Sequence, residues 1–141
     1  MKHSTCEFYN DGKTYTCELT YKDITFTGEA LCHPDDEDLK SERTGYFIAE
    51  MRANIQKLQW IRDWEIFPEL KSYKHIYDCI SHAPEFNKTH YESFCLRRHI
   101  DKLTKDLQEI RETIKEERNY LRNYIAEKDH LYQKIRMGKP C

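Results

Sequence analysis

The sequence predicts an α+β protein: a three-stranded antiparallel β-meander packed on a helix, followed by helices that include a long C-terminal coiled-coil-type helix. Three observations support this fold class. Apolar and polar residues alternate over 5–32, an apolar helical face follows over about 45–60, and apolar residues recur every 3.5 positions over 96–135. A period of two is typical of half-buried strands, and a period of 3.5 of a coiled-coil seam. We expect two regions, 1–62 with the meander and first helix and 63–141 with the other helices.

Two turns define the meander. Asn10-Asp11-Gly12-Lys13 places Asp-Gly at the centre of a two-residue hairpin loop, and Lys22-Asp23 forms a second two-residue turn. The registers that follow are Tyr9–Thr14, Phe8–Tyr15 and Cys6–Cys17, then Tyr21–Ile24, Leu19–Phe26 and Cys17–Gly28. The face expected to be buried reads Cys6, Phe8, Tyr15, Cys17, Leu19, Tyr21, Ile24, Phe26, Ala30 and Cys32. Such a sheet needs a helix across that face.

The run from about Gly45 to Trp60 supplies that helix. Its apolar face carries Phe47, Ile48, Met51, Ile55 and Leu58. We expect this face to bury itself against the sheet, with Ala49 and Ala53 allowing a close approach.

The remaining sequence is helical in pattern. Pro68 suits the first turn of a second helix that ends near His82. Thr89 and Glu92 are spaced as a capping box, which begins a third helix from about 89 to 138.

The apolar stripe of the third helix must be covered. It consists of Leu96, Ile100, Leu103, Leu107, Ile110, Ile114, Glu117, Leu121, Tyr124, Lys128, Leu131 and Ile135. In one covering, the preceding helices fold back on its first half, and the second half projects. In the other, two chains pair as an antiparallel homodimer that matches Glu117 with Lys128, whereas a parallel pair would oppose like charges.

The second half of the long helix is also rich in tyrosine, which is enriched at protein interfaces. We therefore expect it to bind a protein partner. The residues predicted to do so are Glu117, Tyr120, Leu121, Tyr124, Lys128, Leu131, Tyr132 and Ile135.

One segment resembles a metal site. Residues 33–37, His-Pro-Asp-Asp-Glu, are similar to the signature of zinc-dependent N-acetylglucosamine deacetylases. The resemblance implies His33 and Asp36 as zinc ligands and Asp35 as base. That family has a parallel sheet and a further histidine pair, whereas this segment follows an antiparallel meander, so we interpret it as a turn before an acidic helix start. We predict no catalytic residue, metal or cofactor, with a zinc hydrolase as the lesser alternative.

Charge and hydrophobicity argue against two classes of partner, nucleic acids and membranes. The net charge of −2 gives no electrostatic case for nucleic-acid binding or for an anionic membrane. No apolar run is long enough to span a bilayer, and we expect a cytoplasmic protein with reduced cysteines.

A resemblance suggests a class of partner. Residues 27–36, Thr-Gly-Glu-Ala-Leu-Cys-His-Pro-Asp-Asp, then Gly45, Ile48-Ala49-Glu50 and Arg52-Ala53, are similar to small uncharacterised phage and prophage proteins of low-GC Gram-positive bacteria. The resemblance covers about the first 60 residues and implies an accessory phage protein. It implies inhibition of a host protein in the bacterial cytoplasm, such as a CRISPR or other antiphage nuclease. The alternative is a coiled-coil scaffold that only self-associates.

Overall fold

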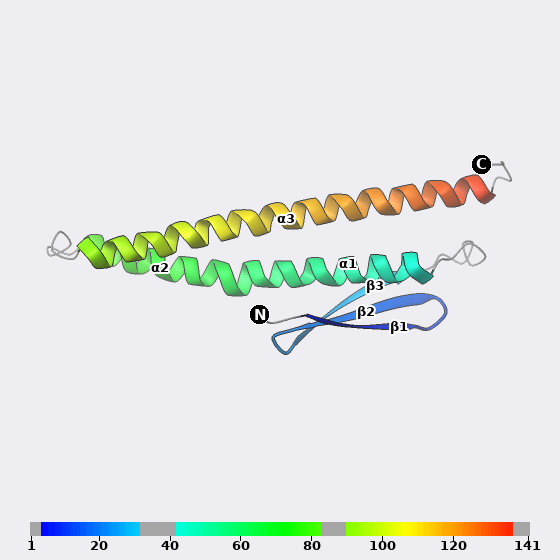
Figure 1. Ribbon diagram of the computed structural model, residues 1–141, viewed down its shortest axis with the longest axis horizontal. Helices are drawn as coiled ribbons and strands as arrows, with labels where there is room; N and C mark the ends of the chain where they lie inside the picture. Colours follow the sequence, from blue (N-terminus) through cyan, green and yellow to red (C-terminus); the bar gives the residue numbers. More distant parts are fainter. Residues whose placement is uncertain (1–3, 32–41, 83–89, 137–141) are drawn as a thin grey trace. The chain divides into compact units, whose positions relative to one another are not determined.

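The computed structural model describes residues 4–31, 42–82 and 90–136, with side chains placed at 94–131 in the last range. Its elements are β1 (Thr5–Asn10), β2 (Thr14–Tyr21), β3 (Ile24–Leu31), α1 (Glu42–Trp60), the π-helix η2 (Ile61–Ile66), α2 (Phe67–Ser81) and α3 (His90–Arg136) (Figure 1). The α+β class is confirmed. Two compact units form: unit 1 holds residues 1–57 and 115–141, and unit 2 holds 58–114. The second half of α3 thus belongs with the meander, which the expected division at residue 62 did not foresee.

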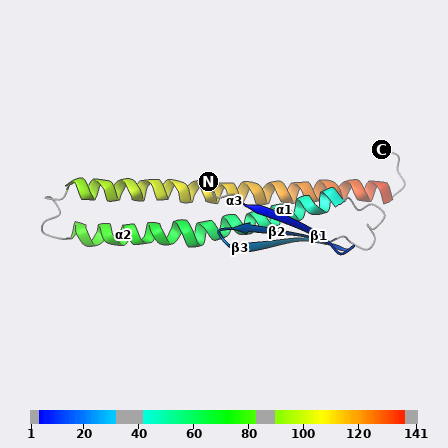
Figure 2. The ribbon, with the colours of Figure 1, turned by 60° about the horizontal axis from the view of Figure 1, so that its bottom comes forward.

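The sheet is an antiparallel meander in which β2 lies between β1 and β3 (Figure 2). The predicted register of β2 with β3 is confirmed, with Cys17 opposite Gly28. Lys22 and Asp23 have φ angles of 49° and 65°. Positive φ at both central residues is the geometry of a type I′ turn, whose twist matches that of the flanking strands.

Because positive φ is costly for residues with a Cβ, this turn can be improved. Replacing Lys22-Asp23 with Asn-Gly is expected to raise the free energy of unfolding by about 1 kcal/mol, which is less than the sum of the two backbone gains. The difference reflects loss of the Lys22 ammonium, which lies 5.3 Å from the Tyr21 ring centroid. Urea denaturation measures the change, and Lys13→Asn, outside any positive-φ position, is the control.

The predicted register of the first hairpin is wrong by two residues. Phe8 lies opposite Cys17, and Asn10 lies opposite Tyr15. The cause is the Asp11 side chain, whose Oδ1 accepts hydrogen bonds from Lys13 N at 3.0 Å and Thr14 N at 2.7 Å. These bonds hold a longer loop in which only Gly12 has positive φ, whereas a type I′ turn would need two such residues. An even shift keeps each side chain on its expected face.

Small residues bring α1 onto the sheet. Ala49 and Ala53 are fully buried, and a Cβ added to Gly28 of β3 would overlap the Ala49 carbonyl oxygen and lie 2.6 Å from Ala53 N. Beside this contact, Arg52 Nη1 donates to the Glu29 carbonyl at 2.6 Å, and Gln56 Nε2 donates to the Thr27 carbonyl at 2.8 Å. The expected role of the two alanines is thus confirmed, and β3 is the strand they contact.

The apolar face of α1 does not lie on the sheet as expected. Met51 and Ile55 form a buried cluster with Leu121 of α3, and the half-buried Phe47, Ile48 and Ile125 pack against it. In unit 1, α1 therefore lies between the sheet and the second half of α3 (Figure 1). The expectation that the second half of α3 would project is wrong. Once Ala49 and Ala53 lie on the sheet, the large apolar side chains on the other side of α1 must be buried elsewhere, and α3 buries them.

Helix α1 covers β2 and β3 better than β1. Tyr15, Cys17, Leu19, Phe26 and Ala30 are buried, as predicted for their face. Cys6 and Phe8 share that face, yet both are exposed, so the prediction of their burial is wrong. Only Tyr46 of α1 reaches toward β1 in the ring contacts of the described residues, with centroids 5.4 Å from Phe8 and 5.1 Å from Tyr15. Cys32 lies outside the described residues.

Burial makes Cys17 a poor nucleophile. It raises the pKa of the Cys17 thiol to about 12, so at pH 8 roughly one thiol in 10⁴ is ionised. We expect Cys17 to resist a thiol-specific disulfide reagent in the folded protein and to react after denaturation. Mass spectrometry of the labelled peptides at pH 8 checks this, with the exposed Cys79 as the internal control that reacts without denaturation. Equal labelling rates at the two cysteines would contradict the burial.

Unit 2 contains the change from α1 to α2. Residues 42–81 are helical throughout, and η2 occupies the turn before Pro68. The Phe67 N–H donates to the Arg62 carbonyl, five residues back. Because Pro68 has no N–H for the carbonyl four residues earlier, a wider turn at this point accommodates it. The proline therefore modifies a continuous helical run, where a separate second helix was expected.

The first half of α3 packs against α2, as the intramolecular covering predicts. The rings of Tyr73 and His99 stack with centroids 5.1 Å apart and planes at 5°. Leu70 of α2 and Leu107 and Ile114 of α3 are buried. The proposed cap residue Thr89 and the side chain of Glu92 lie outside the described residues.

Candidate protein-binding groove

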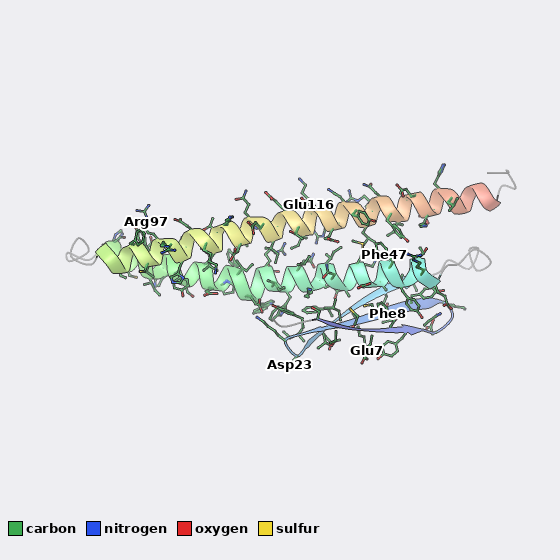
Figure 3. The ribbon with its side chains drawn as sticks, in the orientation of Figure 1. Glu7, Phe8, Asp23, Phe47, Arg97 and Glu116 are labelled. Atoms are coloured by element: carbon green, nitrogen blue, oxygen red, sulfur yellow. The ribbon has the colours of Figure 1, made fainter. Side chains whose placement is uncertain are left out.

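Unit 1 contains a groove between α1 and the second half of α3. Its volume is about 580 Å³, and it is lined by Phe47, Glu50, Met51, Asn54, Glu116, Glu117 and Tyr120. Successive helical turns supply the lining: positions 47, 50, 51 and 54 share one side of α1, and 116, 117 and 120 share one side of α3. Figure 3 shows Phe47 on the side of α1 that faces α3.

Aromatic rings form one end of the groove. The Phe47 centroid lies 4.6 Å from that of Tyr124 and 6.2 Å from that of Tyr120, and the two tyrosine rings lie 6.5 Å apart at 18°. These contacts fix the ring of Phe47 and leave Tyr120 57% exposed. The groove therefore offers a large aromatic surface that is already ordered, which lowers the entropic cost of binding.

Three of the other lining residues are acidic, beside Met51 and Asn54. Among the described residues, Glu50, Glu116 and Glu117 make no hydrogen bond or ion pair. Lys128, the cation of the predicted seam, has its Nζ 5.4 Å from the Tyr124 ring centroid. The groove thus presents three carboxylates beside an aromatic surface, a combination suited to a cationic side chain with an apolar stem.

The predicted partner-binding residues divide into three sets. Glu117 and Tyr120 line the groove, and Tyr124 and Lys128 lie beside it through the ring contacts above. Leu121 is buried in the core of unit 1 and has no surface for a partner, so its assignment is wrong. Leu131 is 41% exposed and does not line the groove. The side chains of Tyr132 and Ile135 lie outside the described residues.

Sequence reasoning missed the half of the groove that α1 supplies. Phe47 and Met51 were expected to lie against the sheet, and Glu50 and Asn54 were not among the predicted binding residues. The sequence did contain an indication of this arrangement. Gly45, Ala49 and Ala53 form a separate side of the same helix, and their small side chains allow that side to approach the sheet closely. The residues on the bulky side then needed another neighbour.

The zinc resemblance receives no test from the structure. His33, Asp35 and Asp36 lie outside the described residues. Within 4–31, 42–82 and 90–136, no cluster of three histidine, cysteine or acidic residues could hold a metal ion. No helix in these ranges has the length and apolar character needed to cross a membrane.

Comparison with known proteins adds no relative. No family model matches the chain, and neither the curated proteins nor the solved structures contain a significant match.

Proposed function

We propose that this protein is a non-enzymatic binding module that holds a basic segment of a partner protein in the groove between α1 and α3. One observation carries the proposal: three carboxylates without partners among the described residues line a groove with an exposed, ordered aromatic end. The arginine guanidinium is the side chain that uses both features, because it pairs with carboxylates and stacks on aromatic rings.

The magnitudes indicate how the partner must bind. A solvent-exposed ion pair contributes about 0.2–1 kcal/mol, and an exposed cation–π contact about 0.5–1 kcal/mol. Neither alone gives a stable complex. Several such contacts, together with apolar area on Phe47, Met51 and Tyr120, are required. The occupant is therefore a segment with at least two cationic residues and apolar neighbours.

The resemblance of the first 60 residues to phage accessory proteins supports a bacterial host protein as this partner. Nucleases that bind nucleic acid expose clusters of Arg and Lys that contact phosphates. An acidic groove competes for such a cluster, so we propose a CRISPR or other antiphage nuclease as the partner class. Occupation of its basic cluster would inhibit it without any reaction by this chain.

A charge-reversal comparison tests the proposal. The tagged protein is used to co-purify partners from a lysate of low-GC Gram-positive bacteria, beside the variant Glu50→Lys/Glu116→Lys/Glu117→Lys. We expect the triple variant to lose at least ten-fold of the captured partner, and capture by the unchanged protein to fall between about 50 and 300 mM salt.

The matched control reverses three exposed acidic residues of unit 1 that do not line the groove, Glu42, Glu127 and Asp129. It changes the net charge equally and should retain capture. Equal loss in both variants would show a general charge effect, and no loss in either would exclude the groove.

A further inference from the structure

The outer edge of the sheet suggests a second interaction, independent of the groove. Strand β1 pairs only with β2 among the described residues, so alternate N–H and C=O groups along its other side lack a strand partner (Figure 2). On the face toward α1, Phe8 remains 43% exposed, and Cys6 is exposed. On the opposite face, Tyr9 is 48% exposed. The strand thus presents both unpaired backbone and uncovered aromatic rings.

We propose that β1 pairs with β1 of a second copy of this chain, antiparallel, to form a six-stranded sheet across a two-fold axis at Phe8. Such an interface is isologous: the same strand serves both subunits. Strand addition at an exposed edge supplies the hydrogen bonds, and the side chains determine the register.

Symmetry restricts the register. A two-fold axis perpendicular to the sheet keeps each side chain on its own face, so it must pass through a pair of identical residues. For the six residues of β1, the greatest overlap places the axis at Glu7 or at Phe8. Glu7 already lies opposite Glu18 of β2, so the first choice would align four carboxylates across the dimer, Glu18 and Glu7 of each chain, which is unfavourable in a sheet. The second sets Phe8 opposite Phe8 and each Glu7 opposite a Tyr9.

The contacts of β1 fit the register centred on Phe8. On one face, the rings of the two Phe8 residues would meet beside Tyr46, which already makes an edge contact with Phe8 at 5.4 Å. On the other face, the Tyr9 hydroxyl donates to the Glu7 carboxylate of its own strand at 2.6 Å. This bond, with the nearby Glu7 charge, raises the pKa of Tyr9 to about 12. In the dimer each Glu7 carboxylate lies opposite the Tyr9 of the other copy, and each of the two hydroxyls donates to one of the two carboxylates. Figure 3 shows Glu7 and Phe8 on β1.

Disulfide trapping tests the register in the full chain. In a Cys6→Ser/Cys17→Ala background, which removes the free cysteine that lies opposite residue 8, Phe8→Cys should form an 8–8 disulfide between chains under mild oxidation, mapped by peptide mass spectrometry. Glu7→Cys should not form a 7–7 disulfide, because its Cα is then opposite residue 9 and outside the disulfide range. A 7–7 disulfide, or the absence of an 8–8 disulfide, would overturn the proposed pairing.

Light scattering tests the dimer itself. At about 100 µM the unchanged protein should have the mass of two chains, and Phe8→Lys should have the mass of one, because it places two ammonium groups opposite each other. Circular dichroism verifies that this half-exposed position does not unfold the variant. Leu131→Lys, an exposed apolar position on α3, should remain dimeric. A monomeric unchanged protein, or a dimer that Phe8→Lys leaves intact, would overturn the proposal, and neither result affects the groove.

Discussion

Gly28→Ala is expected to lower the free energy of unfolding by at least about 3 kcal/mol, the upper part of the range for overpacked sites. The added Cβ would overlap the Ala49 carbonyl oxygen and lie 2.6 Å from Ala53 N. Both are backbone atoms of α1, so no side-chain rotation relieves the overlap. The helix must move off β3, which also weakens the hydrogen bonds of Arg52 and Gln56 to that strand. Urea denaturation followed by circular dichroism measures the loss.

Thr25→Ala is the matched control, because Thr25 lies on the same strand with its side chain exposed. It removes the 3.3 Å hydrogen bond between the Thr20 and Thr25 hydroxyls, so it should lower the free energy of unfolding by about 1 kcal/mol or less. A Gly28→Ala protein as stable as this control would contradict the close packing of α1 on β3.

Leu121→Ala is expected to cost about 3 kcal/mol, as deletion of a buried leucine side chain usually does. Leu121 is the contribution of α3 to the buried cluster with Met51 and Ile55. Its truncation leaves a cavity between the helices and weakens the attachment of the second half of α3 to unit 1. Thermal and urea denaturation measure the change in stability, and hydrogen exchange at residues 115–131 measures loosening of the helix.

Leu131→Ala separates this role from simple loss of a leucine on the same helix. Leu131 is 41% exposed, so its truncation should cost less than about 1 kcal/mol. Equal costs at the two positions would show that the second half of α3 does not pack on α1.

Local patterns predicted the sheet well. The alternation of side chains predicted the buried face of β2 and β3, and the Lys22-Asp23 turn set the register of these strands. The predicted register of β1 with β2 was wrong because the Asp11 side chain stabilises a longer loop. The Asp-Gly pair alone does not distinguish this loop from a two-residue turn. The exposure of Phe8 could not be predicted from the sequence either, because it depends on which of the three strands the helix covers.

The helices show what periodicity leaves open. A heptad stripe correctly predicts a long helix that needs cover, and it does not say which surface provides the cover. Here the cover comes from α1 and α2 in the same chain, because α1 has two usable sides: a small one for β3 and a bulky one for α3. The seam homodimer stays a prediction, and its residues Ile114 and Leu121 are buried within the chain.

The candidate groove was half predictable. Glu117 and Tyr120 were predicted to bind a partner from the charges and aromatic residues along α3, which can be read from the sequence of that helix alone. Glu50 and Phe47 became part of the same site only through the packing of two segments about 70 residues apart in sequence. Such long-range neighbours leave no local signal in one sequence.

Site-specific photo-crosslinking at position 120 tests most directly whether the groove binds a partner. A benzophenone amino acid in place of Tyr120 is irradiated in the bacterial lysate, beside the same substitution at the exposed His130. If the groove binds a partner, we expect one protein to crosslink at position 120 through a peptide rich in Arg or Lys. This crosslink should be lost when the charges of Glu50, Glu116 and Glu117 are reversed. A crosslink of equal yield at both positions, or at 120 to a segment without basic residues, would contradict it.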